Sequence, residues 1–227
     1  MKRTFALVAV AAVTASAMAI DRSDYEIVTA TATEIGEVNP FRVHPIYSNL
    51  GSGQGYVAKP AMTGILGVDD YVGDFSGTPG GVNNGLMTHY QFIGGAATMG
   101  TAGAGLIWFE FFDTLGNYFD GFGALLPQTG NYLWTVTLST PMAVPTAGYH
   151  QVSAEDGTYY AQYITTGTWF MSDATPTFGS SDPNFPGDTF DYGAGAVPIQ
   201  HMFGINSPAP GALALLGLAG LIGRRRR

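Results

Sequence analysis

Residues 132–140 read Tyr-Leu-Trp-Thr-Val-Thr-Leu-Ser-Thr, and this stretch decides the fold class. Large apolar side chains occupy every second position from Tyr132 to Leu138, and mainly hydroxyl side chains lie between them. Successive side chains of a strand point to opposite faces, so this period of two predicts a β-strand with one buried face. Residues 106–112, Leu-Ile-Trp-Phe-Glu-Phe-Phe, are apolar at nearly every position and predict a central strand buried on both faces.

Shorter stretches rich in β-branched and aromatic residues recur on both sides of these two. The 32 glycines and 13 prolines divide the chain at short intervals, so we expect about eight to ten short strands and no long helix between the terminal segments. The remaining strands are expected at residues 25–32, 41–47, 86–93, 149–152, 158–164, 168–171 and 200–205. Asp156 and Gly157 suit a tight hairpin turn.

This spacing of strands and turns predicts an all-β domain, an antiparallel β-sandwich or a jelly roll. Residues 20–206 are enough for one domain with its own hydrophobic core. Flexible, glycine-rich loops are expected at residues 71–84 and 94–105, and residues 173–198 read as an irregular excursion. The chain has no cysteine, so the core must hold the fold without disulfides.

The N-terminus has the features of a secretory signal peptide. Two basic residues at the start precede the apolar stretch 5–13, and Ala17 and Ala19 fit the small-residue rule of a cleavage site. We therefore expect signal peptidase to remove residues 1–19, so that Ile20 begins the mature chain. An uncleaved anchor is the alternative, but the apolar stretch is short for a membrane span.

The C-terminus carries a second apolar segment, expected to form a helix over about residues 210–223. Such a helix rises about 1.5 Å per residue, so residues 211–223 reach about 20 Å, less than the roughly 30 Å hydrocarbon core. The sequence then ends on four arginines, Arg224, Arg225, Arg226 and Arg227. Burying four unpaired guanidinium groups in a soluble core is prohibitive, whereas at a membrane they can snorkel to the headgroups and mark the cytoplasmic end.

The Pro-x-Pro breaker, the short Leu/Ala/Gly run and the arginine cluster together resemble the PEP-CTERM sorting tail of bacterial surface proteins. The consensus Pro-Glu-Pro of that family appears here as Pro208-Ala209-Pro210, and the resemblance covers residues 207–227. It implies export, recognition by the membrane protease exosortase and surface display, often beside exopolysaccharide, and it implies no catalysis. The body is also similar to the β-sandwich ectodomains found ahead of such tails. A tail that stays uncut as a single anchor is the alternative.

Charge separates the body from its termini. Six of the nine lysines and arginines lie in the two terminal segments, so the body has three basic residues against seventeen acids, a net charge of −14. Such a body repels phosphate backbones, which argues against nucleic acid as a partner. It also argues against binding anionic lipid through basic patches.

Motifs for nucleotide or acyl-transfer chemistry are missing from the sequence. No Gly-x-x-x-x-Gly-Lys and no Gly-x-Ser-x-Gly occurs. The four histidines, His44, His89, His150 and His201, have no paired spacing, so a histidine metal site is a weaker expectation than four separately satisfied side chains.

Acidic residues in three loops are the best cation candidates, because calcium prefers carboxylate, amide and carbonyl oxygens. We expect the first loop around residues 69–74, the second at residues 113–120 and the third at residues 182–191. The weak calcium candidates are Asp69, Asp70, Asp74, Asp182 and Asp188. Solvated turn aspartates are the simpler interpretation, and no other cofactor is expected.

Two further hypotheses concern sugars. A glycosidase needs two facing carboxylates, and Glu110 with Glu155 or Asp156 could be proposed. A Glu110 on a sheet edge or paired with Arg42 is the more economical interpretation. A carbohydrate-binding module uses exposed aromatic platforms, for which the candidates are Trp108, Trp134 and Trp169, although large aromatic side chains mostly lie in cores.

Taken together, the sequence predicts an exported, tail-anchored cell-surface or matrix protein with a structural or adhesive role and no enzymatic activity. A carbohydrate-binding module of the cell envelope is the first alternative, and a secreted glycoside hydrolase is the second. The expected partners are signal peptidase, an exosortase-type protease, the membrane and, for the first alternative, a polysaccharide.

Overall fold

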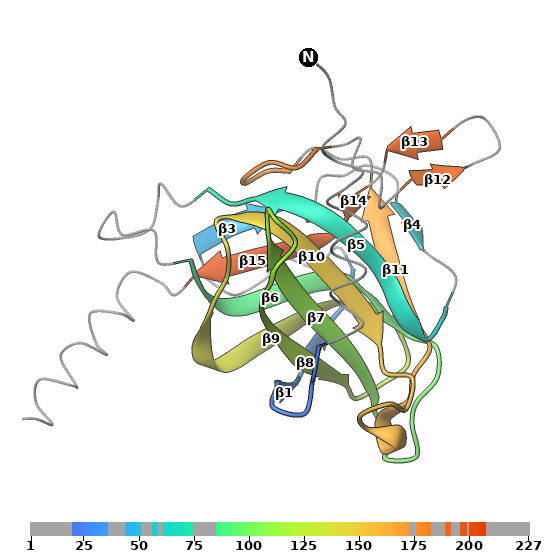
Figure 1. Cartoon of the computed structure of the whole chain (residues 1–227). Coiled ribbons are helices and arrows are strands. Elements are labelled where there is room, and N and C mark those ends of the chain that lie inside the picture. Colours follow the sequence, from blue (N-terminus) through green and yellow to red (C-terminus); the bar gives the residue numbers. More distant parts are fainter. Residues whose placement is uncertain are drawn as a thin grey trace, which may run out of the picture.

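The fold is almost entirely β-strand. The computed structural model describes residues 20–35, 44–50, 56–58, 61–74, 85–172, 176–182, 189–191, 196–198 and 200–207. Within these ranges the one helical element is the short 3-10 helix Ala161–Tyr163. Most strands belong to two sheets that pack face to face as in a β-sandwich, which confirms the all-β prediction (Figure 1).

The first sheet has five strands in the order β1-β8-β7-β10-β5. Their bounds are Glu26–Thr29 for β1, Tyr118–Leu126 for β8, Gly105–Asp113 for β7, Ala147–Ala154 for β10 and Gly64–Val72 for β5. Neighbouring strands are antiparallel except that β1 runs parallel to β8. β7 is paired on both sides and buried along nearly all its length, as its apolar sequence predicts.

The second sheet is built around β6. β9 pairs along one side of β6, and β15 and β11 share the other side. β3 extends the sheet beyond β15, β14 and β4 pair with β11, and β2 pairs with β9. The bounds are Leu86–Ala96 for β6, Gly130–Ala143 for β9, Phe203–Ser207 for β15, Gly167–Ser172 for β11, His44–Ser48 for β3, Gln200–His201 for β14, Tyr56–Ala58 for β4 and Thr31–Thr33 for β2. β12 (Thr189–Asp191) and β13 (Ala196–Pro198) form a separate two-stranded sheet.

Both open sides of the sandwich are joined by short segments. On one side the chain passes from β1 in the first sheet to β2 in the second through buried Ala30, whose amide donates to the carbonyl of Leu125. On the other side residues 176–182 bridge the sheets, because Phe178 pairs with Ser48 of β3 and Ser180 pairs with Val72 of β5. These segments satisfy backbone groups that a sheet edge otherwise leaves unpaired.

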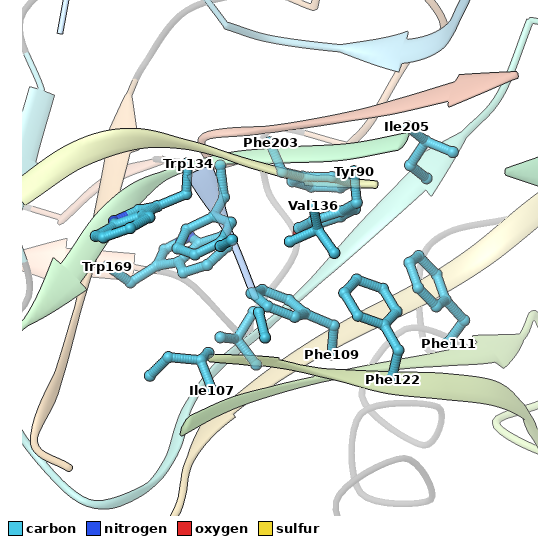
Figure 2. Close-up of a cluster of buried hydrophobic side chains, with 14 of the residues drawn as sticks. Tyr90, Ile107, Phe109, Phe111, Phe122, Trp134, Val136, Trp169, Phe203 and Ile205 are labelled. Carbon is cyan, nitrogen blue, oxygen red and sulfur yellow. The ribbon is translucent and has the colours of Figure 1, made fainter. Parts of the chain in front are cut away.

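The core between the sheets is dominated by aromatic rings. Figure 2 shows Tyr90, Phe203 and Trp169 facing Phe109, Phe111 and Phe122 of the first sheet. Tyr90 and Phe109 approach to 4.7 Å between ring centroids, and Phe92 stacks on Trp169 at 5.2 Å. Offset and edge contacts of this kind add to the stabilisation from burying the rings.

Several local predictions are wrong. Residues 158–164 form a loop with a 3-10 turn, so Asp156-Gly157 does not close a hairpin. β5 and β8 have no predicted counterpart, because glycine and aspartate interrupt both of them. The predicted first strand, residues 25–32, is divided between β1 and β2, and β6 continues through Gly94 into the predicted flexible loop.

Candidate functional site

A buried ion pair lies on the outer face of the first sheet. Arg22 Nε donates to Glu110 Oε1 at 2.6 Å, and Arg22 Nη2 donates to Glu110 Oε2 at 3.0 Å. Gln151 Nε2 donates to the same Oε2 at 2.7 Å, and Arg22 Nη2 also reaches Ser153 Oγ at 3.1 Å. The Glu110 side chain is fully buried, and that of Arg22 is 14% exposed. Both carboxylate oxygens of Glu110 are thus paired where water is largely excluded, while Gln151 Oε1 is buried without a hydrogen-bond partner among the described residues.

The sheet register explains why these groups meet. Gln151 on β10 lies directly opposite Glu110 on β7, so both side chains point to the same face. Arg22 comes from the segment that precedes β1 and crosses this face. Burial by itself lowers the pKa of Arg22, but the hydrogen bond and the charge of Glu110 raise it above its ordinary value. The guanidinium thus stays charged opposite the carboxylate.

Aromatic side chains cover the pair. The Arg22 guanidinium lies 5.4 Å from the ring centroid of Trp108 and 5.8 Å from that of Tyr159. The Tyr159 hydroxyl donates to the carbonyl of Ile20 at 2.6 Å, and the ring of Tyr25 meets Trp108 edge-on at 5.8 Å. Residues 20–25 are therefore held on the sheet at several points, and we call them the N-terminal strap.

Two glycines of β8 make room for this cover. A Cβ on Gly121 would lie 2.7 Å from Tyr25 Cε2 and 2.8 Å from the carbonyl oxygen of Phe109. A Cβ on Gly123 would lie 2.8 Å from Trp108 Cζ3. All three distances are shorter than van der Waals contact, so the rings of Tyr25 and Trp108 can pack against β8 only because these positions have no side chain.

Glu155 is the second buried carboxylate near this face. Its Oε2 accepts from Trp108 Nε1 at 2.9 Å, and its Oε1 accepts from the amides of Gly157 and Tyr159 at 2.7 and 3.1 Å. The side chain is fully buried and holds the loop that supplies Tyr159. These hydrogen bonds indicate that the Glu155 carboxylate fixes the loop to β7.

The proposed glycosidase residues therefore have structural partners. Glu110 lies inside the sheet rather than on its edge, and Arg22 is its basic partner among the described residues; the predicted partner Arg42 lies outside them. Both oxygens of Glu110 and both of Glu155 accept hydrogen bonds from the protein. Asp156 uses its carboxylate to accept from the amide of Thr158.

The three proposed platform tryptophans are buried, Trp134 and Trp169 between the sheets and Trp108 beneath the N-terminal strap. Trp108, Trp134 and Trp169 each have a relative exposure of 0%. Trp134 Nε1 donates to the carbonyl of Gly94 at 2.9 Å, and Figure 2 shows Trp134 and Trp169 pointing into the space between the sheets. A sugar could stack on Trp134 or Trp169 only if the sandwich opened, and on Trp108 only if the N-terminal strap moved off the outer face.

Two histidines lie in the core beside a buried aspartate. His150 Nε2 and the hydroxyl of Tyr90 share a hydrogen bond of 2.7 Å, and burial lowers the pKa of His150 well below its ordinary value. The rings of His150 and His201 are 6.3 Å apart, and the amide of His201 donates to Asp69 Oδ2 at 2.7 Å. Among the described residues, no three His, Asp or Glu side chains form a group that could hold a metal ion.

The calcium candidates are placed differently from the prediction. Asp69 and Asp70 lie on strand β5, not in a glycine-rich loop, and Asp120 lies on β8. Asp69 is fully buried, whereas the carboxylate of Asp70 accepts from the amide of Asp182 at 3.1 and 3.0 Å. The structure thus brings Asp70 and Asp182 together. Asp74 follows β5, and its backbone amide donates to the carbonyl of Ile46. Asp188 lies outside the described residues.

Exposed apolar side chains lie in the β7–β8 turn, a name used here for residues 114–119, which include the first two residues of β8. Leu115 is 77% exposed, Phe119 is 47% exposed and Tyr118 is 38% exposed. Asp113 holds the turn, because its carboxylate accepts from the amides of Leu115 and Asn117 and from Asn117 Nδ2 at 2.8–2.9 Å. Beside the turn, Phe119 lines an open pocket of about 430 Å³ together with Gly85 and residues 143–147.

The predicted signal and sorting residues lie outside the described part of the chain. These are Ala17, Ala19, Pro208, Ala209, Pro210 and Arg224 to Arg227. Within the described residues, no helix has the length and hydropathy of a membrane span. No family model, curated protein or solved structure matched this chain.

Proposed function

We propose that this chain is an exported, tail-anchored protein of a bacterial cell surface or extracellular matrix, with a structural or adhesive role. In this proposal signal peptidase removes residues 1–19 and a jelly-roll-like body forms outside the cytoplasmic membrane. Residues 207–227 hold that body at the membrane as an apolar helix until an exosortase-type protease processes the tail.

The observation that carries the proposal is the position of the N-terminal strap. Ile20, the first residue of the expected mature chain, accepts a hydrogen bond from Tyr159, and Arg22 completes the buried network around Glu110. Both contacts use residues that follow the predicted cleavage site. A cleavage after Ala19 would leave this network complete.

Two further observations favour a structural role over the sugar-active alternatives. The carboxylates of Glu110 and Glu155 serve as buried acceptors for protein donors, and the three tryptophans are fully buried. The ring-filled interior and the paired sides of the sandwich instead suit a stable domain that presents its surface to a matrix.

The proposed localisation can be tested by expressing the protein in a bacterium that has an exosortase and in one that lacks it. An epitope inserted in the exposed turn at residues 101–103 allows the protein to be detected in each cell fraction. Mass spectrometry of the purified chain identifies its N-terminal and C-terminal residues. We expect an N-terminus at Ile20 in both hosts, and tail processing only where the exosortase is present. Recovery from the cytosol with residues 1–19 intact would refute the proposal.

A matched variant separates the two processing steps. Replacing Ala17 and Ala19 with leucine removes the small residues that signal peptidase requires, so we expect the N-terminal segment to be retained at the membrane. Deleting residues 208–227 should leave the N-terminal cleavage unchanged and release the body from the membrane fraction.

A further inference from the structure

The chain leaves the described fold at one defined end of the sandwich. β15 ends at Ser207, and its neighbours in the register are Asn206 opposite His89 of β6 and Ser207 opposite His44 of β3. His89 is close to the start of β6, so Ser207 lies at the end of the sandwich where β6 begins. Figure 1 shows the arrowhead of β15 at the left, away from the 3-10 turn at the lower right.

The apolar β7–β8 turn lies at this same end. Gly85, which immediately precedes β6, lines one pocket with Phe119 of the turn and with Asp113. The amide of Val144 donates to the carbonyl of Gly85 at 2.6 Å, which ties the β9–β10 connection to the same place. Leu115, the most exposed large apolar side chain among the described residues, extends from this end.

The sequence sets a short distance between this end and the apolar tail. Only Pro208, Ala209 and Pro210 separate Ser207 from the run at residues 211–223. The four Cα–Cα steps from Ser207 to Gly211 span at most about 14 Å, and the headgroup layer on one side of a bilayer is roughly 5–8 Å thick. If residues 211–223 lie in a membrane, the end of the body that carries Ser207 must lie against its headgroups.

We propose that the β7–β8 turn, led by Leu115 and Phe119, rests in the outer headgroup region of the membrane that holds the tail. This inference rests on the proposed function, because the tail must first be inserted. Exposed apolar side chains gain from contact with the boundary between headgroups and acyl chains. The carboxylates of Asp113 and Asp120 in the same hairpin keep the contact shallow, since charge is costly in hydrocarbon.

Single cysteines can test the depth of the turn, because the chain has none of its own. Thr114→Cys places a nitrobenzoxadiazole dye beside Leu115, and Ala102→Cys places it in an exposed turn at the other end of β7. The nine residues of β7 separate the two dyes by roughly 27 Å at 3.4 Å per residue. The full chain is reconstituted in phosphatidylcholine vesicles, some of whose lipids carry a nitroxide next to the headgroup.

We expect the dye at Thr114 to shift its emission to the blue and to lose intensity to the nitroxide, whereas the dye at Ala102 keeps the emission it has in water. Adding Leu115→Gln and Phe119→Gln to the Thr114 variant should remove most of that quenching. Both side chains are exposed, so the fold should tolerate the exchange, and circular dichroism checks it.

The outcomes separate this inference from the proposed function. A chain that floats with the vesicles while the dyes at Thr114 and Ala102 respond alike would overturn the contact of the turn and leave the anchor standing. A chain that does not float at all would overturn the anchor itself. Quenching at Thr114 that persists in the double glutamine variant would also overturn the role given to Leu115 and Phe119.

Discussion

The guanidinium of Arg22 and the carboxylate of Glu110 form a two-point contact across 88 residues of sequence, with donor–acceptor distances of 2.6 and 3.0 Å. The contact joins a segment ahead of the first strand to the middle of β7, a strand buried at eight of its nine positions. Glu110 interrupts an otherwise apolar run, and a lone carboxylate there would be prohibitively costly. Arg22 makes its burial tolerable and in turn fixes the N-terminal strap.

Arg22→Ala should lower the free energy of unfolding by about 3–5 kcal/mol, because it leaves the Glu110 carboxylate buried without its cation. Urea unfolding followed by tryptophan fluorescence measures this change. The matched double variant Arg22→Met with Glu110→Leu should be less damaging than Arg22→Ala, since no charge is left unpaired. A loss below about 0.5 kcal/mol for Arg22→Ala would mean that the pair is of little importance to stability.

Gly123→Ala should destabilise the fold by about 1–3 kcal/mol, because its Cβ would lie 2.8 Å from Trp108 Cζ3. Trp108→Phe shortens the ring system that the new methyl group meets. We therefore expect the two substitutions to be non-additive in thermal unfolding, with the double variant more stable than the sum of the single effects predicts. Additive losses would show that the glycine is needed for another reason.

His150 should make the protein less stable in mild acid. Burial lowers its pKa in the folded state, so below the ordinary value of 6.5 only the unfolded chain takes up this proton. The free energy of unfolding should then fall with decreasing pH, by at most about 1.4 kcal/mol per pH unit from this group. His150→Phe should flatten the dependence between about pH 6.5 and pH 5 in urea titrations, and an unchanged slope would assign it to other groups.

Calcium should not stabilise the protein measurably through Asp69 and Asp70. Both carboxylates already accept hydrogen bonds from backbone amides, Asp69 from that of His201 and Asp70 from that of Asp182. A ligand that binds only the folded state must raise the melting temperature. We therefore expect the same melting temperature in excess calcium and in excess chelator, and a rise with calcium would restore these two residues as candidates.

The strands that the sequence predicted correctly have an uninterrupted signal. Alternation in residues 132–140 and the apolar run at residues 106–112 indicated β9 and β7, because burial of one or both faces leaves a periodic pattern. β5 and β8 carry their glycines and aspartates for tertiary reasons. Gly121 and Gly123 leave room for the rings of Tyr25 and Trp108, and Asp69 accepts a hydrogen bond from the amide of His201 on β14. These partners are distant in sequence, so the residues around β5 and β8 do not indicate them.

The ion pair could be predicted only in part. The sequence marks Glu110 as the acid that interrupts an apolar strand, and it favours a sheet edge or a pairing with Arg42; the basic residues of the body are Arg22, Arg42 and Lys59. Sequence alone favoured Arg42, but the choice among the three depends on which segment crosses the outer face of the first sheet. That placement follows from the parallel pairing of β1 with β8, which has no local sequence signal.

The pairing of β1 with β8 also constrains when the protein can fold. The first strand has no partner until the middle of the chain is available, and β3 must wait for β15, near the end of the described chain. Contacts between segments so distant in sequence make folding slow. A chain with this topology cannot complete its second sheet until β15 has been synthesised, so the sandwich closes only after almost all of its residues have been made.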